Sequence, residues 1–191
     1  MADKSPAKLP GFLLIAATLL IALSIPLLPL KMDRRIDWLP LDTIASHYAL
    51  LYFGYPGCDS ACPITLSTLT HVYHQYTDDL PNASQSNLSI VFVNLIDNAP
   101  HEQSQRYASN FHPDFIALAF TRDEMIQAKN LFGLKFSPHQ EDGQLFHKGS
   151  TYLLQKTIQG WRLKRVYSQA DSQLILAHLQ DLNSQTDSKV P

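Results

Sequence analysis

The sequence has 191 residues, of which 45% are hydrophobic and 17% are charged, and its formal net charge is −2. This much apolar material can form a core, so a largely disordered chain is excluded. Two cysteines are too few for a disulfide-rich scaffold or a four-cysteine zinc module. The balanced charge provides no basic surface for nucleic acid. The length predicts one domain with a short addition.

The addition is predicted to be an N-terminal membrane anchor. Residues 11–30 contain no charged side chain, and a helix of this length spans about 30 Å, the thickness of a hydrocarbon core. We therefore expect residues 1–10 in the cytoplasm and one transmembrane helix over residues 11–30. A cleaved signal peptide is the alternative, because Ala22–Ser24 loosely resembles a cleavage site, but the apolar run continues to Leu30.

The remainder is predicted to be one α/β domain over residues 48–183, preceded by a linker (31–47) and followed by a polar tail (184–191). The expected elements are strands at 49–53, 88–96 and 115–120, helices at 63–76, 101–111 and 122–132, a hairpin of strands 151–155 and 161–167, and a helix at 170–182. Thr121 and Glu124 form a capping-box pattern for the third helix. This order predicts a three-layer domain with a mixed sheet, parallel at its centre and antiparallel at one edge, which is the thioredoxin-like arrangement.

The candidate chemistry lies at Cys58 and Cys62, between a predicted buried strand and a predicted helix. A helix N-terminus stabilises an anion, so the pKa of a thiol there falls, and the thiolate is both a nucleophile and a metal ligand. Residues four apart on a helical turn face the same side. The two sulfurs are therefore expected to close a disulfide or to chelate one ion. The alternative is that two small core residues lie close together by chance.

A metal site needs a further ligand. Thiolates select Cu(I), and imidazole also suits copper. His71 and His74 lie about 13 Å along the predicted helix from the cysteines, which is too far to share an ion. His139 and His147 belong to the segment 137–149 before the hairpin, which can fold over the cysteine turn. The spacing alone does not choose between these two histidines.

The segment LYFGYPGCDSACPITL, residues 51–66, resembles the signature of the Sco/SenC family, in which Y-F-G-Y precedes C-x-x-x-C-P and a helix. The likeness continues in residues 92–100 (FVNLIDNAP), 110–121 (NFHPDFIALAFT) and 145–154 (LFHKGSTYLL). The resemblance implies a thioredoxin-like domain held in the periplasm by one helix in the bacterial inner membrane.

The resemblance also implies a site and a function. Two cysteines and one histidine bind Cu(I) or Cu(II) in that family, whose members assist assembly of the copper centre of cytochrome c oxidase. Carried over to matching positions, Cys58 and Cys62 are metal ligands and a redox pair. His147 is favoured over His139 as the third ligand because it lies directly before the strand.

The sequence is identified as a divergent member, because it departs from the family pattern in two places. Aligned without gaps, Asn94 and Asn98 stand where members commonly carry acids, and Gln155-Lys156 replaces an Asp-Pro pair. A carboxylate near the site could orient a ligand or raise its basicity, whereas asparagine adds no charge. Copper affinity or partner choice is therefore expected to differ, with the ligand set unchanged.

Two functions compete. The first is a copper metallochaperone for the copper-bearing oxidase subunit, with another copper chaperone or a thioredoxin-like reductant as a further partner. The second is a thiol–disulfide reductase acting on cysteines of an oxidase subunit or another periplasmic protein. The three-residue spacer between the cysteines differs from the two-residue spacer of ordinary redox motifs and favours metal. A peroxidase is a distant third.

One basic cluster has no assigned role in either function. Arg162, Lys164 and Arg165 alternate with apolar residues in the second hairpin strand. This alternation predicts a solvated strand face, with partner docking as the alternative.

Overall fold

The computed structural model describes residues 33–79, 87–96, 98–134 and 149–187, together with Thr18 and the strand residues 136–137 and 146–147. The anchor predicted at residues 11–30 lies outside these residues, except for Thr18. Within the described part of the chain, no helix combines the length and the apolar character that a membrane span requires.

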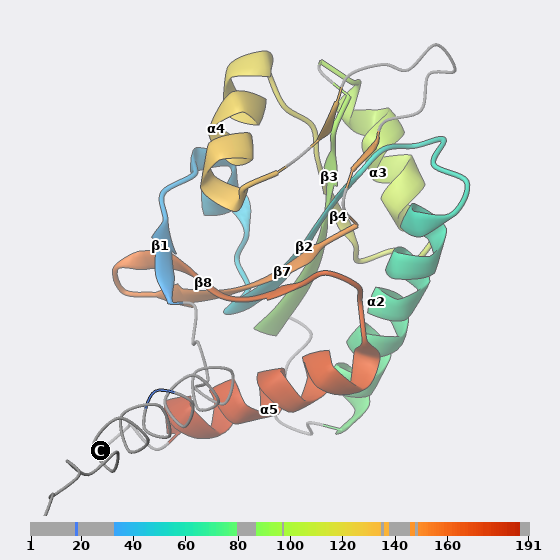
Figure 1. The fold of residues 1–191 in the computed structure, drawn as a ribbon. Helices are drawn as coiled ribbons and strands as arrows, with labels where there is room; N and C mark the ends of the chain where they lie inside the picture. The colour runs from blue at the N-terminus through green and yellow to red at the C-terminus, as the bar shows by residue number, and fades with distance from the viewer. Residues whose placement is uncertain are drawn as a thin grey trace, which may run out of the picture. The chain divides into compact units, whose positions relative to one another are not determined.

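The chain order of the elements follows the predicted alternation of strands and helices (Figure 1). They are β1 (Arg34–Ile36), η2 (Leu39–Thr43), β2 (Tyr48–Gly54), α2 (Ala61–Asp79), β3 (Leu88–Asn94), α3 (His101–Ser109), β4 (Ile116–Leu118), α4 (Arg122–Phe132), β5 (Phe136–Ser137), β6 (Phe146–His147), β7 (Thr151–Thr157), β8 (Gly160–Tyr167) and α5 (Ser172–Asp187). The main sheet has the order β1-β8-β7-β2-β3-β4, and β5 pairs with β6 separately. Strands β2, β3 and β4 are parallel, whereas β7, β8 and β1 are antiparallel. The mixed sheet predicted from the sequence is confirmed, but β1 rather than the hairpin forms its edge.

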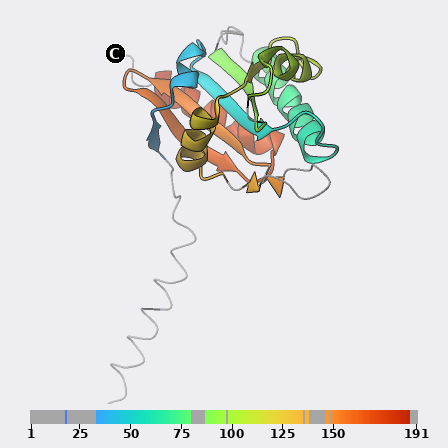
Figure 2. The same cartoon turned by 90° about the horizontal axis from the view of Figure 1, so that it is seen from above.

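Strand β2 is buried along its whole length because helices cover both faces of the sheet. Successive side chains of a strand point to opposite faces. Tyr48, Leu50 and Tyr52 therefore join a core beneath α2, α3 and α5, while the intervening side chains join a second core beneath η2 and α4. Figure 2 shows the sheet between these layers, with α2 on one side and α4 on the other.

The stretch predicted as a linker contributes to this second core. Its described part contains β1 and η2, and the indole Nε1 of Trp161 in β8 donates to the carbonyl of Leu41 at 3.0 Å. The buried side chains of this stretch include Ile36, Trp38, Leu41 and Ile44. The folded domain therefore includes residues from β1 onward. At the other end, α5 extends to Asp187, into the predicted polar tail.

Two residues of the basic cluster of β8, Arg162 and Lys164, are paired with an acid on the partly exposed face of the strand. Asp33 accepts from Arg162 Nε at 2.6 Å and lies 3.3 Å from Lys164 Nζ. The side chains of Arg162 and Lys164 are only 27% and 18% exposed. The Arg162 hydrogen bond holds the pKa of Asp33 below its usual value. Asp33, the residue before β1, therefore provides a carboxylate for the two positive charges of Arg162 and Lys164.

Helix α4 begins as predicted. Thr121 Oγ1 accepts from the N–H of Glu124 at 3.4 Å, and Glu124 Oε2 accepts from the N–H of Thr121 at 2.9 Å. This is a complete capping box, which satisfies two N–H groups that the helix leaves unpaired. The helix ends at Gly133, whose φ of 63° is a left-handed conformation that glycine adopts readily.

Helix α3 closes the edge of the sheet at β4. Gln105 Nε2 donates to the carbonyl of Phe115 at 2.7 Å, and Gln105 Oε1 accepts from the N–H of Ala117 at 2.9 Å. His101 Nε2 lies 3.1 Å from the carbonyl of Ala117.

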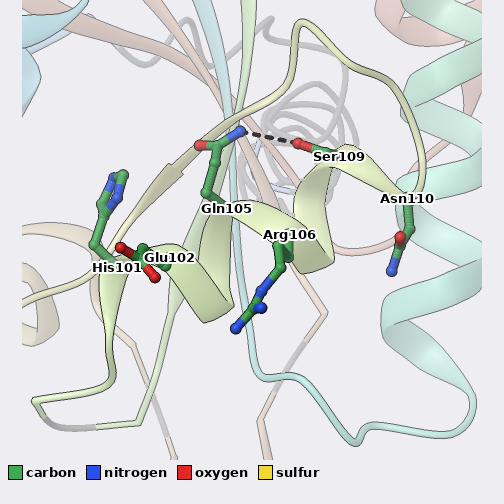
Figure 3. Close-up of a pocket in the computed structure, with 6 residues that line it drawn as sticks. All are labelled: His101, Glu102, Gln105, Arg106, Ser109 and Asn110. Carbon is green, nitrogen blue, oxygen red and sulfur yellow. Dashed lines mark hydrogen bonds between the residues drawn. The ribbon is translucent and has the colours of Figure 1, made fainter.

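A hollow of about 550 Å³ runs along this helix (Figure 3), lined by His101, Glu102, Gln105, Arg106, Ser109 and Asn110. Two of these side chains are already committed to β4, and neither cysteine lines the hollow.

Candidate metal and redox site

The cysteines lie in the turn that joins β2 to α2. Strand β2 ends at Gly54, whose carbonyl accepts from the N–H of Leu95 at 2.7 Å, next to the end of β3. Gly57 has a φ of 108°, which side chains other than glycine rarely adopt, and it reverses the chain before Cys58. Helix α2 begins at Ala61, two residues before the predicted start at Pro63. Cys62 therefore lies in the first turn of α2, and Cys58 precedes it.

The structure brings the two thiols together. The N–H of Cys62 donates to Cys58 Sγ at 3.4 Å. The two cysteines form no disulfide, and Cys58 is half-buried whereas Cys62 is buried. The pair is therefore close enough to close a disulfide or to hold one ion between its sulfurs.

The two thiols have opposite pKa shifts. Burial raises the pKa of Cys58, but hydrogen bonds from Cys62 and from the N–H groups of Ser60 and Ala61 more than offset it, and the pKa lies below its ordinary value. These donors are the free N–H groups of a helix start. Burial raises the pKa of Cys62 to about 12. Of the two sulfurs, that of Cys58 therefore carries the larger thiolate fraction.

Gly54 is a glycine because the sulfur of Cys62 occupies the space of a side chain. A Cβ placed on Gly54 would lie 2.8 Å from Cys62 Sγ, 3.0 Å from Cε1 of Tyr52 and 3.1 Å from Cε2 of Phe92. Contacts under 3.0 Å are essentially never found for a real Cβ. The end of β2 is therefore shaped around the buried thiol.

The segment that carries the candidate histidine passes next to the start of α2. A Cβ placed on Gly149 would lie 3.6 Å from the hydroxyl of Tyr52 and 3.9 Å from the Cβ of Ala61. His147 lies two residues earlier in β6, where it pairs with Phe136. Two residues span at most about 7 Å. The backbone of His147 therefore lies within that distance of Gly149.

The other histidines fall in different places. His139 lies outside the described residues. His71 and His74 are exposed on α2, and the His74 ring lies 5.0 Å from the ring of His112, away from the thiols in sequence and in contacts. Among the described residues, no group of three or more His, Cys, Asp or Glu side chains could hold a metal ion. The two cysteines are the thiol donors that the described part of the chain offers.

The two asparagines at family acid positions have structural roles. Asn94 is fully buried at the end of β3, where its Nδ2 donates to Ser104 Oγ at 2.8 Å and its Oδ1 accepts from the N–H of Ile96 at 3.0 Å. Asn98 is exposed and has a φ of 54°, a left-handed conformation that asparagine tolerates. The hydrogen bond of Asn94 to Ser104 thus connects the end of β3 to α3.

Tyr52 is a site residue that the sequence analysis missed. It was included only as part of an apolar strand, yet its ring edge lies 3.0 Å from the position that a Cβ on Gly54 would take, which is 2.8 Å from the Cys62 sulfur, and its hydroxyl lies 3.6 Å from the corresponding position on Gly149. The sequence feature that could have identified Tyr52 is its position two residues before Gly54, which places both residues on the same face of β2.

A cysteine pair at the start of the helix that follows a central parallel strand defines a thioredoxin-like protein. A family model described as SCO1/SenC matches residues 41–182, and the chain belongs to that family. The membership inferred from the cysteine motif is confirmed.

The similar proteins agree with this assignment. The SCO2-like protein of Rickettsia prowazekii is 23% identical over 141 residues, which cover 71% of this chain and 65% of that protein, so the match spans just under two thirds of the relative's length. Copper-bound ScoI of Arabidopsis thaliana has a TM-score of 0.64 at 17% identity and covers 81% of this chain and 97% of that one. BsSco, described with a disulfide switch and as a member of the Sco family of cytochrome c oxidase assembly proteins, has a TM-score of 0.55 at 18% identity over 74% of this chain and 82% of that one. These likenesses confirm the predicted α/β fold.

Proposed function

We propose that this chain is a membrane-anchored copper metallochaperone. Copper is its cargo, held by Cys58, Cys62 and His147 and passed by ligand exchange to the copper-bearing subunit of cytochrome c oxidase. The observation that carries the proposal is the contact between the Cys62 N–H and the Cys58 sulfur at 3.4 Å, in a turn against which Gly149 of the histidine segment packs.

The donor set suits copper. Two thiolates are soft ligands that select Cu(I), and an imidazole completes a three-ligand site. Binding requires the proton of Cys62 to leave, because a metal ligand must be deprotonated. Cys58 is half-buried, so an incoming ligand can reach it first and take over the ion one bond at a time. A disulfide would remove both thiolates, so cargo binding needs the reduced pair.

Similar proteins support copper as the cargo and cytochrome c oxidase as the acceptor. ScoI of Arabidopsis thaliana is copper-bound, and BsSco belongs to a group described as cytochrome c oxidase assembly proteins. By extension we propose the bacterial inner membrane, with the domain in the periplasm. Another copper chaperone would supply the ion, or a thioredoxin-like reductant would keep the thiols reduced.

A second candidate function is thiol–disulfide reduction. The observation that favours it is the division between the thiols, with the pKa of Cys58 lowered and that of Cys62 raised to about 12. In exchange chemistry the thiolate attacks a partner disulfide and the second thiol then resolves the mixed disulfide. Such an activity toward an oxidase subunit is compatible with copper delivery, but it does not need His147.

The test is Cu(I) binding by the reduced full chain under anaerobic conditions, in competition with a chromophoric Cu(I) chelator. We expect one tightly bound Cu(I) per chain, lost in the double variant Cys58→Ser, Cys62→Ser and in His147→Ala. His71→Ala is the matched control, because His71 is exposed on α2, and it should bind as the unmodified chain does.

Two results would change the assignment. Binding that survives His147→Ala but is lost in His139→Ala would move the third ligand to His139. If the unmodified chain binds no Cu(I) while its thiols still cycle with a disulfide, the metallochaperone is excluded and the reductase remains.

A further inference from the structure

Two histidine rings meet away from the cysteines, where α2 contacts the segment 110–115 that joins α3 to β4. We propose that the imidazoles of His74 and His112 form a second metal site, which takes a divalent transition-metal ion and binds Cu(II) most strongly. The site goes beyond the proposed function, because it uses neither thiol.

The two rings lie at the separation that a shared ion requires. His74 is exposed on α2, and its ring centroid lies 5.0 Å from that of His112, with 74° between the ring planes. An imidazole nitrogen binds such ions at about 2 Å, which places each ring centroid about 3 Å from the metal. Two such centroids around one tetrahedral ion are about 5 Å apart. The observed separation therefore fits two imidazoles on one ion.

The His112 ring is held in place by its neighbours. Its centroid lies 4.7 Å from that of the Tyr73 ring and 5.5 Å from that of the Phe115 ring, and its side chain is only 14% exposed. Thr70 Oγ1 donates to the carbonyl of Phe111 at 3.4 Å, which connects the segment to α2. A ligand whose ring is already ordered loses little conformational entropy when it binds an ion.

Asp114 provides the carboxylate that commonly supports a histidine ligand. Its N–H donates to His112 Nδ1 at 3.2 Å, so Nε2 is the nitrogen left for an ion. A neutral ring that binds a metal through Nε2 carries its proton on Nδ1. Asp114 Oδ2 lies 3.9 Å from Nδ1 and accepts from the Tyr73 hydroxyl at 3.1 Å. A carboxylate in this position can accept from Nδ1–H, orient the ring and raise its basicity.

The donor set selects the class of ion. Imidazole suits Cu(II), Ni(II) and Zn(II), whereas Cu(I) prefers thiolates, and affinity among the divalent ions peaks at Cu(II). Among the described residues, no cluster of three or more His, Cys, Asp or Glu side chains could hold an ion. Water must therefore complete the coordination of a two-imidazole site, and we expect it to bind more weakly than a three-ligand site.

The test is a Cu(II) titration of the full chain that carries Cys58→Ser and Cys62→Ser, which removes the thiol site. Electron paramagnetic resonance detects the nitrogen ligands. We expect one bound Cu(II) with two imidazole nitrogens, weakened at least about tenfold by His74→Ala and by His112→Gln, since each removes a ligand. Asp114→Asn should weaken binding about tenfold, the size expected for a lost supporting carboxylate.

His71→Ala is the matched control, because His71 is exposed on the same helix, three residues before His74. It should leave Cu(II) affinity and the spectrum unchanged. Cu(II) should also raise the melting temperature of the thiol-free chain, because an ion held by α2 and by the segment 110–115 binds only the folded state. His74→Ala should abolish this rise. If His112→Gln does not fold, the exposed His74→Ala variant decides.

Three results would overturn the inference. They are a thiol-free chain that binds no Cu(II), an unchanged affinity and spectrum in His74→Ala, and an equal loss in His71→Ala, which would place both ligands on α2. The metallochaperone is tested by Cu(I) on the unmodified chain, so either proposal can fail while the other stands.

Discussion

The backbone N–H of Cys62 donates to the sulfur of Cys58 at 3.4 Å, so a thiol occupies the place at the start of α2 where a hydroxyl or carboxylate oxygen usually accepts. The same turn leaves Cys62 buried and Cys58 half-buried. Two residues four apart in sequence therefore have very different chemical properties, and several measurable consequences depend on this difference.

The first consequence is an order of reactivity. Cys58 has a lowered pKa, whereas that of Cys62 is about 12, so Cys58 carries far more thiolate at pH 7. We expect iodoacetamide to modify Cys58 more than about tenfold faster than Cys62, since each pKa unit changes the thiolate fraction about tenfold. Peptide mass spectrometry of a time course measures the order. Faster labelling of Cys62 would contradict the assignment of Cys58 as nucleophile.

The second consequence concerns the glycine that ends β2. Gly54→Ala would bring a Cβ within 2.8 Å of the Cys62 sulfur, and we expect it to destabilise the fold by about 1–3 kcal/mol and to weaken Cu(I) binding. Gly149→Ala is the matched control, because its nearest neighbour would lie at an ordinary 3.6 Å. Chemical denaturation and chelator competition measure the two effects. If the two variants have the same free energy of unfolding and the same Cu(I) affinity, the Cys62 sulfur moves aside without a cost in free energy.

Asn94 gives a third prediction. Asn94→Ala would leave the N–H of Ile96 and the hydroxyl of Ser104 without the amide that joins them, at a cost of about 1–3 kcal/mol in unfolding free energy. Asn98→Gly should be nearly neutral, because glycine adopts the φ of 54° at least as readily. Denaturant unfolding compares them. A stable Asn94→Ala variant with altered copper affinity would instead indicate a role at the metal site.

The contact of β1 with β8 predicts a pH dependence. The Arg162 hydrogen bond holds the pKa of Asp33 below its unfolded value, so the stabilisation is present above that value and is lost as pH falls through the folded pKa. The carboxylate is 46% exposed, so we expect Asp33→Asn to cost less than about 1 kcal/mol at pH 7. The difference between the two proteins should shrink below about pH 4. A difference that persists at pH 2 would assign the effect to packing rather than charge.

Local sequence signals predicted much of this fold. The capping box of Thr121 and Glu124 and the apolar run of β2 were sufficient to place α4 and the central strand, because both depend on neighbours in the chain. Strand β1 was missed because three residues with one buried side chain carry too little periodicity. Its partners are Trp161, Arg162 and Leu163 of β8, which are far from β1 in the sequence.

In the candidate site, too, the sequence predicted some features and missed others. The spacing of Cys58 and Cys62 predicted that the two residues lie close together, and the N–H of Cys62 indeed lies 3.4 Å from the Cys58 sulfur, although Cys58 precedes α2 instead of belonging to it. The crowding of Tyr52 and the Cys62 sulfur around Gly54 joins two elements through their side chains, and no local pattern encodes it. The start of α2 at Ala61 was missed because Pro63 was taken as the first residue, although proline is tolerated anywhere in the first turn.

The amide of Gln105 has the donor and the acceptor of a peptide group, and it binds the carbonyl of Phe115 and the N–H of Ala117 as a neighbouring strand would. One side chain thus ends the hydrogen-bond ladder of the sheet and occupies groups that a second molecule could use for edge-to-edge pairing. This side of β4 therefore offers fewer unpaired backbone groups than an open sheet edge would.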